Sequence, residues 1–210
     1  MKTLIVSIGK TAVSRERSCD SSEFDRLRQA ESACDIIPIE DKRISADGRQ
    51  VYVGPGRAAR QTAEQYFTDA SITVEPLLDE IPQRSYKDTN KKLPLWLWRL
   101  MACLQQFFGI RRQPETKKQA KARAEKLIAQ LEAQGRDCIL VSYPGFIKVL
   151  LDRFQAHGYC IARSGVFGIS PLERVLITKR DMHCGGCSHN CLLTNPGCGV
   201  GRDKARRHSS

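Results

Sequence analysis

The sequence predicts an α/β domain, a three-layer α/β/α sandwich in which a mostly parallel sheet carries helices on both faces. Short apolar runs rich in β-branched residues recur along the chain, and each is followed by a polar or glycine-containing loop and then by helical spacing of apolar residues. The chain has 210 residues, of which 41% are hydrophobic, so it can bury one substantial core. We therefore expect one domain over residues 1–180.

The first strand is predicted at residues 4–6, and it runs into a loop at residues 7–11. Ligands of open α/β sheets collect beyond the carboxyl ends of central strands, so this loop is the first candidate for a site. Gly9 allows a ligand to approach the backbone closely, and Lys10 and Thr11 can hold an anion. The loop contains no His, Cys, Asp or Glu, and it therefore predicts binding rather than catalysis.

The later elements alternate in the same way. Further strands are expected at residues 50–53, 72–74, 137–142, 159–163 and 174–178. Helices are expected at residues 14–33, with a cap at 21–23, and at 57–67, 117–134 and 146–157.

Two features of these elements suggest chemistry. The helix expected at 57–67 begins with Arg57 and Arg60, and a helix N-terminus with nearby positive charge can bind an anion. Such arginines are equally common on exposed helix starts that bind nothing. Asp79 and Glu80 follow the strand at 72–74, where they can act as a general acid or cap a helix.

Positive charge is concentrated in one part of the chain. The formal net charge is +11, and residues 84–126 contain 12 Lys or Arg against three acidic residues. A basic segment of this kind favours phosphorylated ligands, nucleic acid or anionic lipid, and a solvated helix face beside a basic loop explains it equally well.

An apolar segment with basic ends lies within this region, at residues 91–113. Its apolar run, residues 93–110, is interrupted by Arg99 and is shorter than the roughly 20 residues that cross a bilayer. We expect a helical lid over the site, because Trp96 and Trp98 both lie here and the core needs large side chains. The alternative is an interfacial element over residues 91–112 whose basic ends contact anionic lipid in peripheral membrane binding.

Four motifs, taken in order, suggest a family. They are Ser-Ile-Gly-Lys-Thr at 7–11, Gly-Pro-Gly-Arg-Ala-Ala-Arg-Gln-Thr-Ala at 54–63, Leu-Asp-Glu at 78–80 and Ser-Tyr-Pro-Gly at 142–145. With this order and spacing, residues 1–180 resemble the histidine phosphatase superfamily, also called the phosphoglycerate mutase-like family. The resemblance implies a phosphoglycerate mutase-like fold.

The resemblance also implies a degenerate active site. In the family, a His in an Arg-His-Gly loop is phosphorylated, two arginines and a second His hold the phosphoryl oxygens, and a Glu handles the proton. The corresponding positions here are Ser7, Ile8, Ala58 and Tyr143, and only Glu80 is retained. An isoleucine side chain has no lone pair, so it cannot form a phosphoenzyme.

We therefore expect a pseudoenzyme that binds a phosphorylated small molecule or a protein partner, with Gly9, Lys10, Thr11, Arg57 and Arg60 left to attract an anion. Drift of a dispensable site explains the same substitutions. The alternative functions are a divergent phosphatase or hydrolase, or a redox or sulfur-transfer protein that works through its cysteines.

The segment at 181–201 has the spacing of a metal site. Its cysteines follow the pattern C-x2-C-x3-C-x6-C and are Cys184, Cys187, Cys191 and Cys198. Four thiolates suit zinc, with His183 or His189 able to replace one of them. An iron-sulfur cluster is the alternative, although the spacing matches neither standard ferredoxin run, and disulfides or free thiols are the remaining possibilities.

The last residues, 202–210, are basic and are expected to be disordered. The metal segment can tie the C-terminus to the domain or bind a partner. We do not expect nucleic acid binding, because the tail has no aromatic residue on which a base can stack. The apolar run after Met1 and Lys2 is too short for a signal peptide, so a cytoplasmic protein with reduced thiols is expected.

Overall fold

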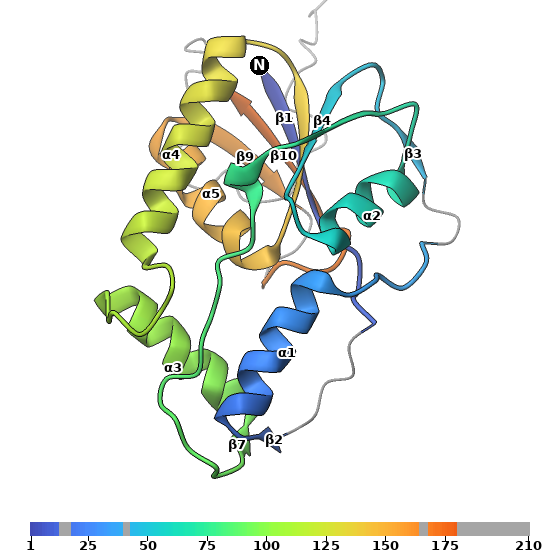
Figure 1. Cartoon of the computed structure of the whole chain (residues 1–210). Helices are drawn as coiled ribbons and strands as arrows, with labels where there is room; N and C mark the ends of the chain where they lie inside the picture. Colours follow the sequence, from blue (N-terminus) through green and yellow to red (C-terminus); the bar gives the residue numbers. More distant parts are fainter. Residues whose placement is uncertain (13–17, 40–42, 164–167, 180–210) are drawn as a thin grey trace, which may run out of the picture.

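The computed structural model describes residues 1–12, 18–39, 43–163 and 168–179, and its centre is a six-stranded sheet (Figure 1). The strand order is β6-β4-β8-β1-β10-β9. The strands are β1 (Lys2–Ser7), β4 (Gln50–Val53), β6 (Ser71–Val74), β8 (Cys138–Ser142), β9 (Tyr159–Arg163) and β10 (Arg174–Lys179). The pairs among β6, β4, β8 and β1 are parallel, and β10 is antiparallel to both of its neighbours. The sheet is mostly parallel, as predicted.

Strand position in the sheet follows from side-chain composition. All five residues of β8 are buried, and its apolar run suits a strand that is covered on both faces. The β1 strand lies next to it and pairs residue by residue from Thr3 opposite Cys138 to Ser7 opposite Ser142. The four residues of β6, at the sheet edge, are all exposed.

Helices cover both faces of the sheet, which confirms the predicted three-layer sandwich. The α4 (Lys117–Gln134) and α5 (Pro144–Ala156) helices pack on one face, against Ile5, Leu140 and Val175. The α2 helix (Arg57–Tyr66) packs on the other face, against Val51 and Val141. The apolar face of each of these helices is thus buried against one face of the sheet.

A smaller lobe is built from α1 (Ser21–Ala33), α3 (Leu95–Phe108) and the short strands β2 (Ser18–Cys19) and β7 (Leu93–Pro94), which pair antiparallel (Figure 1). Its core contains Cys19, Phe24 and Trp98. The Trp98 indole donates to the Cys19 carbonyl oxygen at 2.9 Å and stacks on Phe24. Trp96, in contrast, is 66% exposed, so the expectation that both tryptophans fill the core is wrong for Trp96.

The start of α1 differs from the prediction. The helix begins at Ser21, and its N-cap is Asp20, whose carboxylate accepts from the Glu23 N–H while the Glu23 side chain accepts from the Asp20 N–H. This capping box satisfies two N–H groups that a longer helix would have to satisfy elsewhere. Residues 13–17 lie outside the described residues.

The remaining short elements are β3 (Ile44–Ser45), which pairs with β5 (Phe67–Thr68), and the 3-10 helix η1 (Pro76–Leu78). None of the helices in the described ranges is long and apolar enough to cross a membrane. The predicted metal segment at 181–201 and the basic tail lie outside the described residues.

Candidate ligand-binding site

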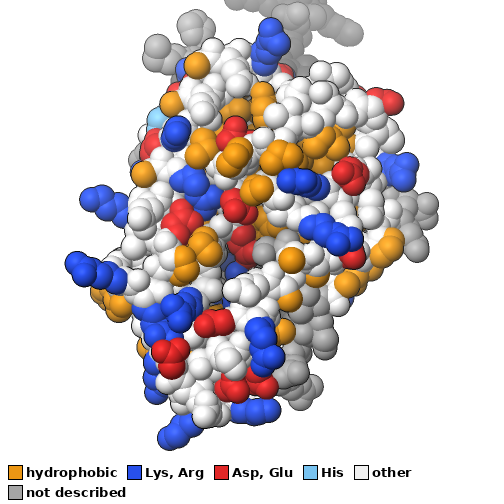
Figure 2. Space-filling view, viewed as in Figure 1, with side chains coloured by type: hydrophobic (Ala, Val, Ile, Leu, Met, Phe, Trp, Pro, Cys, Tyr) orange, Lys and Arg blue, Asp and Glu red, His pale blue; other side chains and the backbone are white. Residues whose placement is uncertain are grey.

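A cavity of about 660 Å³ lies beyond the carboxyl ends of β1 and β8. Its walls come from the loop after β1, from α1, from the chain after η1, from α3 and from the first turns of α4 and α5. Figure 2 shows a hollow near the middle of the molecule, with acidic, basic and hydrophobic side chains around it. The volume is in the range of small-molecule sites in proteins.

The loop after β1 is held by its own backbone. The Ile8 N–H donates to the Ser142 oxygen at 3.1 Å, and the Ile8 oxygen accepts from the Leu172 N–H at 3.3 Å. The Gly9 N–H donates to the Thr62 hydroxyl oxygen at 2.9 Å. Because the backbone N–H groups of Ile8 and Gly9 already donate to protein atoms, they are not available to donate to a ligand.

The backbone at Gly9 lies close to the side chain of Ile36. A Cβ atom there would lie 3.3 Å from Cδ1 of Ile36 and 3.6 Å from the Thr62 hydroxyl oxygen. A side chain at position 9 would therefore crowd the end of the Ile36 side chain, which would have to shift slightly.

An ion network forms the back wall of the cavity. The Arg28 guanidinium contacts Glu31 of the same helix and lies 2.5 Å from Oε1 of Glu80, while Arg99 of α3 lies 2.7 Å from the other oxygen of Glu31. The side chains of Arg28, Glu31 and Glu80 are only 13–18% exposed. Burial raises the pKa of the Glu80 carboxyl, and the charge of Arg28 opposes part of that rise.

The sequence reasoning missed Arg28, Glu31 and Arg99. Arg28 and Glu31 are three residues apart on a predicted helix, and this spacing places two side chains next to each other, so their contact could have been predicted from the sequence. Their contact with Glu80 and with Arg99 depends on chain folding, because these partners are 52 and 68 residues apart in sequence.

The mouth of the cavity is basic. Lys10, Lys117 and Lys148 line it from three different elements and are exposed. The Lys117 amine also lies 5.2 Å from the centre of the Phe107 ring. With both carboxylates of the wall already beside arginines, these lysines leave the cavity with an excess of positive charge.

Two of the residues predicted to bind an anion lie outside the cavity. Arg57 and Arg60 are exposed and are not among the residues that line the cavity, and Arg57 lies 2.8 Å from a carboxylate oxygen of Asp35. Consecutive helix residues are about 100° apart, so Arg57 and Arg60 project on other sides of α2 than the buried Ala58. Gly9, Lys10 and Thr11 do line the cavity.

Comparison with known proteins gives a family. The model of the histidine phosphatase superfamily (branch 1) matches residues 28–178. This chain belongs to the histidine phosphatase superfamily. None of the curated proteins compared with it matches.

One solved structure shares the fold of this chain, and two others are similar to the chain at lower TM-scores. A phosphoserine phosphatase from Entamoeba histolytica, crystallised as a mutant with phosphoserine, is 13% identical over 83% of this chain and 89% of its own, with a TM-score of 0.50. A mycobacterial hydrolase is 14% identical over 83% and 80% of the two chains, with a TM-score of 0.49. An α-ribazole phosphatase from Shigella flexneri is 16% identical over 73% and 79%, with a TM-score of 0.45.

The residues that the sequence predicts at the positions of the family motif lie close together in this structure. Ile8, Ala58 and Tyr143 belong to one hydrophobic cluster, and each is at most 8% exposed. Ser7 is fully buried and its hydroxyl has no partner among the described residues. These positions are therefore occupied mainly by buried apolar side chains.

Tyr143 is the residue that the sequence predicts at the position of the second His of the family motif. Its hydroxyl is buried and has no hydrogen-bond partner within the described part of the chain. Burial, followed by the nearby charge of Glu80, raises the pKa of Tyr143 well above the usual range. The phenol therefore stays neutral at physiological pH.

No histidine lines the cavity among the described residues. His157 follows α5, and its ring lies 2.5 Å from a carboxylate oxygen of Glu125 on α4. His183, His189 and His208 lie outside the described residues.

The predicted metal ligands Cys184, Cys187, Cys191 and Cys198 lie outside the described residues as well. Within the described ranges, no group of three or more His, Cys, Asp or Glu side chains is placed to hold a metal ion. The five cysteines there are not joined in disulfides, and Cys103 lines the cavity.

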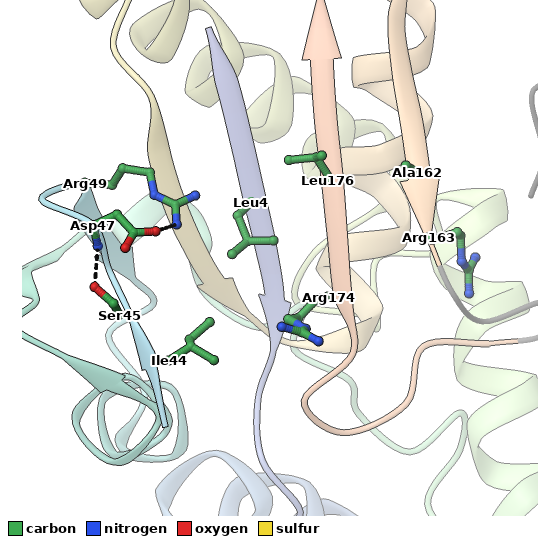
Figure 3. Close-up of a pocket in the computed structure, with 9 residues that line it drawn as sticks. All are labelled: Leu4, Ile44, Ser45, Asp47, Arg49, Ala162, Arg163, Arg174 and Leu176. Atoms are coloured by element: carbon green, nitrogen blue, oxygen red, sulfur yellow. Dashed lines mark hydrogen bonds and ion pairs between the residues drawn. The ribbon is translucent and has the colours of Figure 1, made fainter. Parts of the chain in front are cut away.

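A second hollow, of about 630 Å³, lies over the middle of β1, β10 and β9 (Figure 3). Leu4 and Leu176 form its floor, with Arg49, Arg163 and Arg174 around it. Arg49 pairs with Asp47, and Arg163 pairs with Glu173. This hollow is away from the strand ends where α/β folds bind ligands, so the first cavity is the candidate site.

Proposed function

We propose that this member of the histidine phosphatase superfamily is a pseudoenzyme that binds a phosphorylated small molecule in the cavity beyond β1 and β8. The observation that carries the proposal is Ile8, a hydrocarbon side chain at the position of the nucleophilic His, only 8% exposed and held by backbone hydrogen bonds on both sides. No other imidazole among the described residues lines the cavity to replace it.

The charge around the cavity supports an anionic ligand. Lys10, Lys117 and Lys148 stand at the mouth, and none of the three has a carboxylate partner within 4.0 Å in the described part of the chain. A phosphate group placed between their amines would gain charge-assisted hydrogen bonds.

The walls support a ligand with an apolar portion as well. Ile81, Leu100, Leu104 and Val149 line the cavity together with the charged groups. A phosphorylated molecule with a hydrocarbon or aromatic part therefore fits this lining better than inorganic phosphate does.

Two measurements on the purified full chain test the proposal. The first is phosphate release from phosphoserine and phenyl phosphate, for which we expect no turnover above background. The second is calorimetric binding of the same two compounds, for which we expect phenyl phosphate to bind more tightly. Lys10→Ala combined with Lys148→Ala weakens that binding by about 30-fold, since each of the two lost charged contacts is worth roughly 1 kcal/mol.

Arg57→Ala combined with Arg60→Ala is the matched control, because it removes the same charge from outside the cavity. It should leave binding unchanged. Turnover that Glu80→Gln abolishes would overturn the pseudoenzyme assignment, and equal effects of the two double variants would overturn the site.

Cys103 supports a second candidate function, that of a divergent phosphatase. Its thiol lines the cavity and accepts a hydrogen bond from the Gln83 amide at 3.2 Å. A thiolate can attack a phosphomonoester, forming an S–P bond as the alcohol leaves, and water then releases phosphate. Phosphate release that is lost in Cys103→Ser and kept in Cys34→Ser would favour this candidate.

The cysteine-rich segment is a separate proposal. We infer that Cys184, Cys187, Cys191 and Cys198 bind one zinc ion, with an iron-sulfur cluster as the alternative. A redox or sulfur-transfer role would depend on these same thiols. The spacing of the four cysteines supports the site, and metal analysis tests it.

A further inference from the structure

The α3 helix exposes an apolar face to solvent. Trp96, Leu100, Leu104, Phe107 and Phe108 are all exposed, with Phe108 the most exposed at 71%. At about 100° per residue, these five side chains fall within one arc of roughly 120°. None of the residues of α3 that are exposed carries a charge.

The polar groups of α3 point the other way. Arg99 pairs with Glu31, the Gln105 amide donates to the Tyr86 oxygen at 2.9 Å, and the Gln106 amide donates to the Pro82 oxygen at 2.9 Å. A surface helix normally buries its apolar face and exposes its polar one. Here the buried Trp98 and Ala102 attach the helix, and a second apolar face is left uncovered by the described residues.

Positive charge surrounds this face. Lys91 and Lys92 precede α3, and Arg111, Lys117 and Lys118 follow it. Among the described residues, Lys92 has a carboxylate partner, Glu23 at 3.9 Å, whereas Asp88 and Glu115 pair with Arg112 and Arg123 and so leave the other four cations without one. In Figure 2, Lys and Arg side chains project from the lower left of the molecule, over α3 and the start of α4, with hydrophobic side chains at the same edge.

We propose that the exposed face of α3 docks on an anionic phospholipid surface. Trp and Phe side chains favour the boundary between headgroups and acyl chains, and flanking lysines and arginines are attracted to anionic headgroups. The charges also disfavour a second copy as the occupant. An antiparallel two-fold pairing of α3 helices would bring Lys91 and Lys92 of one copy towards Arg111 of the other, and a parallel one would bring each of these groups towards its own counterpart, so both place like charges together.

The proposal does not depend on the proposed function, although the two surfaces adjoin. Leu100, Leu104 and Phe107 belong both to the exposed face and to the lining of the cavity. A membrane bound at α3 would therefore lie beside the mouth of the cavity.

The test uses the full chain and sedimentation with vesicles of phosphatidylcholine, with and without phosphatidylglycerol. We expect binding only with phosphatidylglycerol and weaker binding at high salt. The chain has two tryptophans and Trp98 is already buried, so a blue shift of the fluorescence on binding reports Trp96. Trp96→Phe should keep the binding and lose the shift.

Phe108→Gln combined with Ile110→Gln removes two exposed apolar side chains that do not line the cavity. We expect vesicle binding to weaken by about tenfold or more, because binding scales with the apolar area inserted. The matched control is Ile72→Gln combined with Val74→Gln, which changes two exposed apolar side chains on β6.

Three results would overturn the proposal. They are no sedimentation of the wild-type chain with phosphatidylglycerol vesicles, equal binding by the two double variants, and sedimentation without a shift of Trp96. The third would assign the contact to another basic segment, such as residues 202–210.

Discussion

Replacing Arg28 with Met tests the ion network at the back of the cavity. Arg28 on α1 contacts Glu31 and Glu80, and all three side chains are nearly buried. Methionine keeps an unbranched apolar stem and removes the charge. Glu31 retains Arg99 at 2.7 Å, whereas Glu80 is left with no cation partner among the described residues.

The size of the effect follows from this burial. Removing one partner of a buried ion pair costs about 3–5 kcal/mol. Residual exposure lowers that cost, and so does protonation of Glu80, so we expect the free energy of unfolding to fall by about 2–3 kcal/mol at pH 8. With a urea slope of about 2 kcal/mol/M, the unfolding midpoint falls by roughly 1–1.5 M.

The loss should depend on pH. The pKa of Glu80 in the folded protein is already raised by burial, and removing Arg28 raises it further. The folded state then binds a proton that the unfolded state releases, so the stability from this group is present at low pH and is lost as the pH rises through the folded pKa. Arg28→Met should therefore cost less at pH 5 than at pH 8.

The assay is urea unfolding followed by tryptophan fluorescence at both pH values. Arg26→Met is the matched control, since Arg26 is exposed on the same helix, and its effect should stay within about 0.5 kcal/mol. An Arg28→Met protein as stable as the control, or equally destabilised at the two pH values, would refute the role given to the network.

Three further predictions concern the apolar site and the metal segment. Ile8→His should not restore phosphomonoester hydrolysis, because Ala58 and Tyr143 would still stand in place of the groups that hold the phosphoryl oxygens. An unpaired buried imidazole should also lower the free energy of unfolding by about 1–3 kcal/mol, measured by thermal unfolding. Turnover in this variant would contradict the expectation. Tyr143→Phe removes a hydroxyl that has no partner among the described residues, so the free energy of unfolding should be unchanged or rise by up to about 1 kcal/mol, and a clear loss in a urea titration would count against it. The purified chain should be colourless and contain one zinc ion per chain by elemental analysis, which Cys184→Ser reduces, whereas a brown protein with bound iron would favour the cluster.

Local sequence patterns predicted much of the fold. The run from Cys138 to Ser142 is apolar, and it forms the fully buried β8. The helix predicted at 117–134 is observed, with Thr116 and Gln119 as its capping box and Gly135, at φ +63°, as its end. These patterns involve only residues that are close in sequence, and so they can be recognised without the tertiary structure.

The errors have a different origin. The helix predicted at 14–33 begins only at Ser21, where Asp20 and Glu23 form its N-terminal cap. The residues before this cap are also helix-compatible in composition, so composition alone places the start too early. Trp96 was assigned to the core because aromatic residues usually lie there, yet only Trp98 has Cys19 and Phe24 beside it. Which tryptophan is buried depends on how α3 is rotated against α1.

By itself, the sequence determined the family, whose model matches residues 28–178, and predicted that Ile8 stands where the family has its nucleophile, because a motif read along the chain identifies each position by its neighbours. Only the tertiary structure decided which charges meet at the cavity. Arg28 reaches Glu80, and Arg99 reaches Glu31, across 52 and 68 residues of chain. Arg57 and Arg60, which the sequence favoured, are exposed outside the cavity, because helix rotation and chain closure are properties of the packed molecule.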